Sequence, residues 1–116
     1  AGAGQRVLLA AAPDAVIVRV LAADLPAFTP RTLDRVGLRA SIAAVRESGW
    51  AVSRGELEPG AVSVAVPVHV NAEVVCSLDV VGPESRCGSR EWVRRAVDIL
   101  QATASELSEN LERRSL

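Results

Sequence analysis

The residues most able to bind a small molecule alternate with apolar residues along two neighbouring stretches. Residues 61–70 carry valine at every even position, and their odd positions hold Ala61, Ser63, Ala65, Pro67 and His69. Residues 74–80 repeat the alternation, with Ser77 and Asp79 at odd positions. This is the period of a β-strand with two unlike faces. The odd face, which Val81 continues, is small or polar, so it leaves room for a ligand or for another element of the same protein.

The backbone at the start of the chain offers a second kind of chemistry. Gln5–Ala12 suits a short buried helix, and Gly2, Ala3 and Gly4 resemble the start of such a helix. The first turn of a helix has free N–H groups, which can bind an anion. The same residues also fit a plain helix start without a ligand.

Groups suited to catalysis are sparse in this sequence. Glu56 and Glu58 lie in a mobile loop over residues 54–60, where they can act as general acid and base or simply be solvated. The sequence has no nucleophile–base pair and no phosphate-binding loop, and the two cysteines do not form a CxxC motif. His69 is the only histidine. We therefore expect no enzyme activity, no metal site and no cofactor.

The turn between the two alternating stretches decides which strand faces meet. A two-residue loop at Asn71-Ala72 would place the valine row beside Val75, Ser77 and Asp79. A three-residue loop would place it beside Val74, Cys76, Leu78 and Val80. A slip of one residue turns a whole strand over, so the apolar pattern favours an odd-length loop. One face of the hairpin is then a continuous apolar surface for helices to cover.

Helical periodicity predicts that four helices and a short strand accompany the hairpin. The helices start near Gln5, at Pro13, after the capping residue Asp34 and after the capping residue Ser89, and Gly49 ends the third. The inward residues of the last three are Val16, Ile17, Val20 and Leu21; Val36, Leu38, Ile42 and Val45; and Val93, Ala96, Val97, Leu100, Ala104, Leu107 and Leu111. With a short strand at Trp50–Ser53, the order is α-α-α-β-β-β-α. Three strands form a thin sheet, so we expect the first strands of the domain to be missing from this chain.

The composition is that of one globular domain. The chain has 116 residues, 49% of them hydrophobic, and a formal net charge of -1. All thirteen basic residues are arginine, but no basic run suggests a nucleic-acid surface. Neither a membrane span nor a signal peptide is recognisable, so we expect a cytoplasmic protein that does not bind membranes.

An ordered set of short motifs resembles the effector-binding domain of IclR-type bacterial transcription regulators. The motifs are LLA, TPRTL, VRESGWAV, ELEPG, VAVPV and VVGP, followed by the long final helix. The resemblance implies an α+β fold, with a GAF-like antiparallel sheet, helices packed on one face and a ligand pocket on the other. It also implies that residues 1–116 are the later part of an effector-binding domain whose N-terminal winged helix-turn-helix domain is absent here. Regulators of this family are usually homodimers or tetramers.

The resemblance also places the family's ligand pocket on this chain. The start matches the backbone segment that holds a ligand carboxylate, which implicates Gly2 and Ala3. Ser53 follows the glycine–aromatic strand at a position that is often acidic, and Ser63 stands where cysteine is common, with Ala61 two residues earlier. The family's SxSGP signature reads DVVGP here, which puts Asp79 and Val81 at the two serine positions.

This departure from the signature bears on the ligand. An ionised Asp79 repels an anion, so the ligand can be neutral, cationic, or larger and more apolar than a short oxoacid. Asp79 can instead pair with an arginine and be structural. The function expected is a domain that binds a small metabolite and controls DNA binding by the winged-helix domain. The alternative is a dimerisation module whose pocket is filled by its own side chains.

Overall fold

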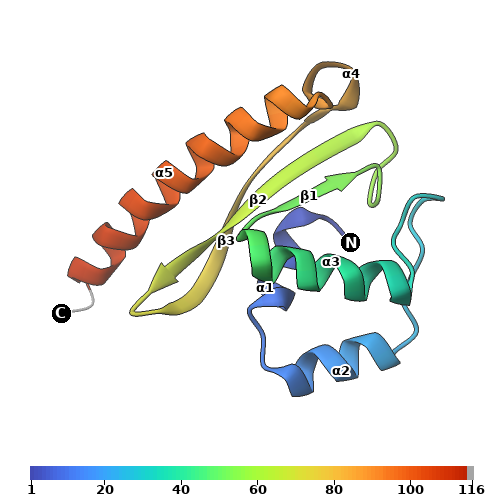
Figure 1. The fold of residues 1–116 in the computed structure, drawn as a ribbon, viewed down its shortest axis with the longest axis horizontal. Coiled ribbons are helices and arrows are strands. Elements are labelled where there is room, and N and C mark those ends of the chain that lie inside the picture. Colours follow the sequence, from blue (N-terminus) through green and yellow to red (C-terminus); the bar gives the residue numbers. More distant parts are fainter. Residues whose placement is uncertain (115–116) are drawn as a thin grey trace.

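The computed structural model describes residues 1–114 as a three-stranded antiparallel sheet surrounded by helices (Figure 1). The elements are α1 Ala3–Ala10, α2 Asp14–Ala22, α3 Arg35–Ser48, β1 Ala51–Arg54, β2 Ala61–Val70, β3 Glu73–Pro83, α4 Glu84–Cys87 and α5 Arg90–Arg114. The sheet order is β1-β2-β3. The predicted α+β class and element order are confirmed, with the short helix α4 as an addition. In the described part of the chain no helix is long and apolar enough to cross a membrane.

The valine row of β2 forms the floor of the larger apolar cluster. Val62 and Val64 have 0% exposure, and Val66 and Val68 have 1%. Val64, Val66 and Val68 pack against one side of α5, whose buried residues are Val93, Val97, Leu100 and Ala104. The prediction that helices cover the valine face is therefore confirmed.

The hairpin register agrees with the apolar pattern, although the turn differs from the expected one. Val64 lies opposite Val80 and Val66 opposite Leu78, as an odd-length loop would require. The loop nevertheless has two residues, Asn71 and Ala72, both with positive φ. The register shifts by one residue between Val68 and His69, where a β-bulge leaves one extra residue on β3. The odd-length loop was thus wrong, because the bulge corrects the register that a two-residue turn imposes.

Helices lie against both faces of the sheet, which corrects the expectation that they pack on one face. The odd side of the sheet contributes Ala51 and Ala65 to a second cluster, which α1 joins through Ala3 and Val7. In Figure 1, α5 runs along one side of the sheet, while α1, α2 and α3 lie on the other. The small odd-face residues therefore admit α1 onto the middle of the sheet.

Two predicted helix ends are confirmed by the hydrogen bonds at their caps. The Asp34 carboxylate accepts a bond of 2.8 Å from the Gly37 N–H at the start of α3, and the Ser89 hydroxyl accepts one of 3.1 Å from Trp92 N–H at the start of α5. Gly49 ends α3 with φ of 83°. The inward residues were mostly right, except that Val16 is 37% exposed and Val36 is 77% exposed. Val36 lies in the first turn of α3, where the periodicity continues but no neighbouring element covers it.

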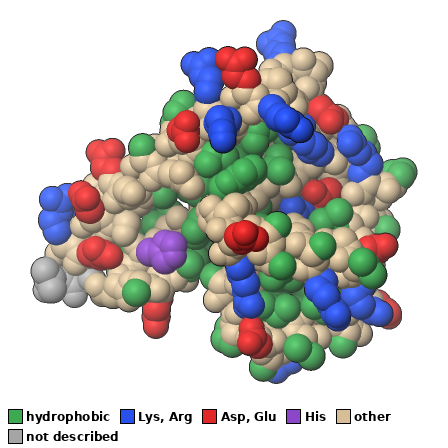
Figure 2. Space-filling view, in the orientation of Figure 1, with side chains coloured by type: hydrophobic (Ala, Val, Ile, Leu, Met, Phe, Trp, Pro, Cys, Tyr) green, Lys and Arg blue, Asp and Glu red, His purple; other side chains and the backbone are tan. Residues whose placement is uncertain are grey.

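A groove remains between α5 and the edge strand β1. Its volume is about 870 Å³, and its apolar residues are Trp50, Val52, Val93 and Val97. Figure 2 shows hydrophobic surface in the middle of this face, with basic side chains along its upper edge. The helix thus covers the valine row of β2 more fully than it covers β1.

Candidate functional site

A cavity of about 330 Å³ lies where the first turn of α1 meets the odd face of the sheet and the loop after β1. Its walls include all seven residues that the sequence singled out: Gly2, Ala3, Ser53, Ala61, Ser63, Asp79 and Val81. Residues separated by most of the chain are thus brought together at one place. Gly4, Leu8, Leu57 and Ser77 complete much of the remaining wall.

Strand register places the sheet residues of this cavity side by side. Ser63 on β2 lies opposite Ser53 on β1 and opposite Val81 on β3. Asp79 lies one row further along, opposite Ala65. Because directly opposite residues of an antiparallel pair project to the same face, Ser63 and Asp79 share a surface while Val64 and Val66 face α5. This is the arrangement that the proposed pocket requires.

Helix α1 brings free backbone donors to the edge of the cavity. Gly2 precedes the helix with φ of 97°, and no side chain caps this end. The Ala3 N–H donates to the Ser63 hydroxyl at 3.4 Å. The N–H groups of Gly4 and Gln5 belong to the first turn, where no carbonyl of the helix can accept from them. The end of α1 therefore presents hydrogen-bond donors and a partial positive charge beside the cavity.

The absence of a side chain at Gly4 allows α1 to approach the hairpin closely. A Cβ atom at this position would lie 3.1 Å from the Ser77 Oγ and 3.7 Å from the Asp79 Oδ2. The Asp79 carboxylate is therefore near the first turn of α1. The helix dipole favours the negative charge of the Asp79 carboxylate at this position.

The lining of the cavity is acidic. Glu56, Glu58 and Asp79 contribute carboxylates, of which only Glu56 has a paired arginine, and no arginine or histidine side chain of residues 1–114 lines the cavity itself. The ion pairs of the described chain join Arg6 to Glu56, Arg31 to Glu84 and Arg46 to Asp14. Asp79 is not among them, and its side chain is exposed to the cavity. The paired, structural alternative for Asp79 thus finds no arginine partner in this part of the molecule.

Glu56 is buried and paired, contrary to the solvated loop residue expected from the sequence. Its carboxylate accepts a hydrogen bond from Arg6 Nη2, and both side chains are almost fully buried. Arg6 Nη1 also donates to the carbonyl of Val52 at 2.9 Å. Burial lowers the pKa of Arg6, and the charge and hydrogen bond of Glu56 oppose that shift. The pair joins α1 to the loop after β1.

Sequence reasoning missed this ion pair, although one signal for it was present. An arginine between apolar residues of a short buried helix needs a partner, because a buried charge is costly when it is unpaired. Arg6 therefore predicts an acid, but the partner lies fifty positions away along the chain. Only the folded structure identifies it as Glu56.

The loop that carries Glu56 is also tied to the connector between α2 and α3. The hydroxyl of Thr29 donates to the Gly55 carbonyl, and the hydroxyl of Thr32 donates to the Glu56 carbonyl. The TPRT segment thus fixes one wall of the cavity, and it anchors residues 55 and 56 within the loop that the sequence predicted to be mobile.

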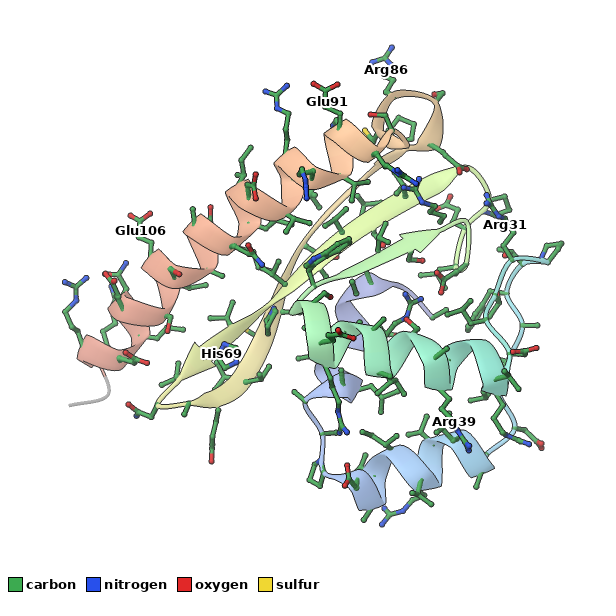
Figure 3. All side chains as sticks on the ribbon, viewed as in Figure 1. Arg31, Arg39, His69, Arg86, Glu91 and Glu106 are labelled. Carbon is green, nitrogen blue, oxygen red and sulfur yellow. The ribbon has the colours of Figure 1, made fainter. Side chains whose placement is uncertain are left out.

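The other candidate reactive groups lie elsewhere. His69 is near the turn of the hairpin, at the opposite end of the sheet from Arg31 (Figure 3). Its backbone carbonyl accepts a hydrogen bond from the Ser108 hydroxyl. Both cysteines are free thiols. Within residues 1–114 no three side chains of the metal-binding types are grouped closely enough to hold a metal ion.

This arrangement of helices, sheet and cavity is that of an effector-binding domain. Residues 1–109 match the family described as Bacterial transcriptional regulator IclR C-terminal, so the chain belongs to this family. It is 39% identical over 109 residues to the Pca regulon regulatory protein of Pseudomonas putida. That match covers 91% of this chain and 38% of the relative.

Solved structures agree with this assignment. An IclR transcriptional regulator from Alicyclobacillus acidocaldarius superposes with a TM-score of 0.86 at 37% identity, covering 93% of this chain and 44% of the other. An IclR homolog from Microbacterium hydrocarbonoxydans, complexed with 4-hydroxybenzoate, has a TM-score of 0.87 at 28% identity, covering 97% and 45%. The chain spans less than half the length of these relatives.

Proposed function

We propose that this domain binds a small-molecule effector in the cavity between α1 and the sheet, and that binding controls a DNA-binding domain. One observation carries the proposal: the seven residues expected in the pocket line a single cavity. Its volume of about 330 Å³ is at the lower end of the usual range for small-molecule sites. Hydroxyls, helix N–H groups and apolar side chains around it provide the mixed lining that such sites use.

The composition of the cavity favours ligands that donate hydrogen bonds toward Asp79. An alcohol, phenol or ammonium group can donate to this carboxylate, and the serine hydroxyls can donate or accept. The complex of the Microbacterium protein with 4-hydroxybenzoate suggests an aromatic ring of similar size. In such a molecule the phenolic hydroxyl is the group that suits Asp79, while a carboxylate suits the free N–H groups of α1.

The proposed mechanism is a shift between two arrangements of the regulator. An effector in the cavity contacts α1, the hairpin and the loop that contains Glu56 at once, so it stabilises the arrangement in which these elements are close. Ligands change an equilibrium only through their different affinities for its two states. A winged-helix domain N-terminal to this chain would follow the shift, within a homodimer or tetramer. A bacterial regulator of this kind acts in the cytoplasm.

The direct test is native mass spectrometry of the purified full-length protein. We expect a co-purified small molecule, seen as added mass that is lost on denaturation. Ser63→Leu should abolish the added mass because the larger side chain fills the floor of the cavity. The matched control is Ser105→Leu on the exposed side of α5, away from this cavity. Added mass that survives Ser63→Leu would place the ligand elsewhere.

The competing view is a dimerisation module whose pocket is filled by its own side chains, and the absence of a cavity above Ser63 and Asp79 would favour it. The cavity is present, and both residues line it. The named relatives are transcription regulators rather than enzymes. These two findings favour sensing over dimerisation alone and over catalysis.

A further inference from the structure

A second cavity of about 270 Å³ lies on the other side of the buried Arg6–Glu56 pair. It is formed by α1, the end of α2, the connector and the start of α3. Apolar side chains make up most of its wall, and they include Leu9, Val20, Leu25, Phe28, Leu33 and Leu38. Its character is therefore opposite to that of the polar, acidic cavity described above.

The two cavities adjoin each other. Ala1, Gly2, Gln5 and Glu56 contribute to the walls of both. These residues surround the first turn of α1, which means that a molecule bound at that turn can reach both spaces. A continuous site of this kind has a polar half and an apolar half.

The boundary between the cavities is fixed and electrically balanced. The guanidinium of Arg6 bonds to Glu56 and to the Val52 carbonyl, so its main donors are already engaged. The Thr32 hydroxyl holds the backbone of Glu56 from the connector side. An apolar group can pass a neutral ion pair without the penalty that an unpaired charge would impose.

The wall of the second cavity contains an exposed aromatic ring. Phe28 is the only phenylalanine of the chain, and 54% of it is accessible to solvent. A large apolar side chain that lines a cavity and stays exposed is a surface that a ligand can cover. The adjoining cavities, the neutral boundary and this ring together indicate an occupant with an apolar part.

We infer that the second cavity extends the effector site and receives an apolar tail of the ligand. This inference rests on the proposed function, because the polar head of the same molecule would occupy the first cavity. The ligand class is then an amphipathic molecule with a neutral or cationic hydrogen-bonding head beside Asp79 and an alkyl or aromatic tail of a few carbons. Such a molecule uses about twice the volume that either cavity offers alone.

The test compares two neutral probes, phenol and 4-propylphenol, by titration calorimetry with the full-length protein. Each methylene group that is buried should strengthen binding about fourfold, so 4-propylphenol should bind more than about tenfold tighter than phenol. Val20→Phe fills the second cavity and should reduce this ratio to less than about threefold. Val18→Phe is the matched control, since Val18 lies on the same helix but is exposed and does not line the cavity.

A more than tenfold preference for 4-propylphenol in the unaltered protein, and its loss in Val20→Phe, would support the inference. If Val20→Phe does not fold, Leu38→Phe is a second variant that fills the cavity. A preference that is absent from the unaltered protein, or that persists in the filled variants, would overturn the inference. The proposed function has a separate readout, which is the loss of phenol binding in Ser63→Leu. Phenol binding that depends on Ser63 without any preference for the propyl chain would therefore refute the tail site alone.

Discussion

At the scale of the residue, Asp79 determines which charges the cavity accepts. Its carboxylate is exposed to the cavity, and none of the ion pairs within residues 1–114 includes it. We predict that Asp79→Ser strengthens the binding of small carboxylates that have no hydroxyl to donate to Asp79, such as benzoate, about fivefold, because it removes a partly screened repulsion. Titration calorimetry measures the change, and the gain should shrink as salt is added.

The control for this substitution is Asp98→Ser. Asp98 is exposed on α5 and lines the groove beside β1 rather than the cavity. It therefore changes the net charge equally but leaves the local charge of the cavity unaltered. Equal affinity for benzoate in Asp79→Ser and the parent protein would show that Asp79 does not set the charge preference.

A second residue-scale prediction concerns the buried Arg6–Glu56 pair. Arg6→Met leaves the Glu56 carboxylate buried without its partner, so we expect unfolding to become easier by about 3–5 kcal/mol. Arg31→Met breaks the exposed pair with Glu84 and should cost less than about 1 kcal/mol. Urea denaturation followed by circular dichroism compares the two variants. Similar losses of stability in both would mean that burial does not distinguish the pairs.

Some of the cavity residues could be predicted from the sequence, but the ion pair beside the cavity could not. The positions of Ser63 and Asp79 on one face follow from alternation within the hairpin, and the family resemblance added Gly2 and Ala3 from the far end of the chain. The partner of Arg6 could not be predicted, since many acids were available and only the packing of α1 on the sheet selects Glu56.

At the scale of the element, the hairpin contains a local conflict at its turn. Asn71 and Ala72 both have positive φ, at 51° and 69°. Two-residue turns of this shape favour asparagine followed by glycine, and alanine pays a steric penalty there. We predict that Ala72→Gly stabilises the fold by about 0.5–1 kcal/mol, as measured by urea denaturation.

The matched control for the turn is Ala102→Gly, an exposed position within α5. The same substitution in a helix interior should destabilise the fold by about 1 kcal/mol. Opposite signs for the two variants would confirm that backbone conformation controls the effect. Destabilisation by Ala72→Gly as well would refute strain at the turn.

Element boundaries were less predictable than element types. The valine row identified β2 fully, and the caps Asp34 and Ser89 located two helix starts. The apolar alternation covered residues 74–80, whereas β3 runs to Pro83 because Ala61 and Val62 still lie opposite Pro83 and Gly82. Pairing with β2 thus extends β3 beyond the stretch that its apolar pattern identifies.

At the scale of the whole molecule, effector binding should be visible as stability. A ligand that binds only the folded state stabilises it by about 2.7 kcal/mol at a concentration one hundred times its dissociation constant. We therefore predict a ligand-dependent rise in the urea midpoint of the full-length protein, with 4-propylphenol as the first probe. Ser63→Leu should remove the rise while Ser105→Leu retains it. An unchanged midpoint in the presence of bound probe would argue that the ligand also binds the unfolded chain.

The whole-molecule view also explains why the sheet has helices on both sides and still contains a cavity. Alternation in the hairpin predicts one apolar and one small, polar face, but it does not say how far a helix extends over the latter. α1 covers Ala51 and Ala65 and stops at Ser63, where its first N–H meets the hydroxyl. The position of the N-terminal end of α1 therefore determines where the covered part of the sheet ends and the cavity begins. This position depends on tertiary packing.

The bulge in β3 constrains how the length of this hairpin can vary in evolution. Regular pairing of all the present residues from the two-residue turn, without the bulge, would rotate the rest of β3 by half a turn. Asp79 and Val81 would then point toward α5, and Leu78 and Val80 would enter the effector cavity. Deleting the extra residue would instead remove the bulge and keep the register of the rest of β3, so a hairpin one residue shorter can keep the same residues at the cavity.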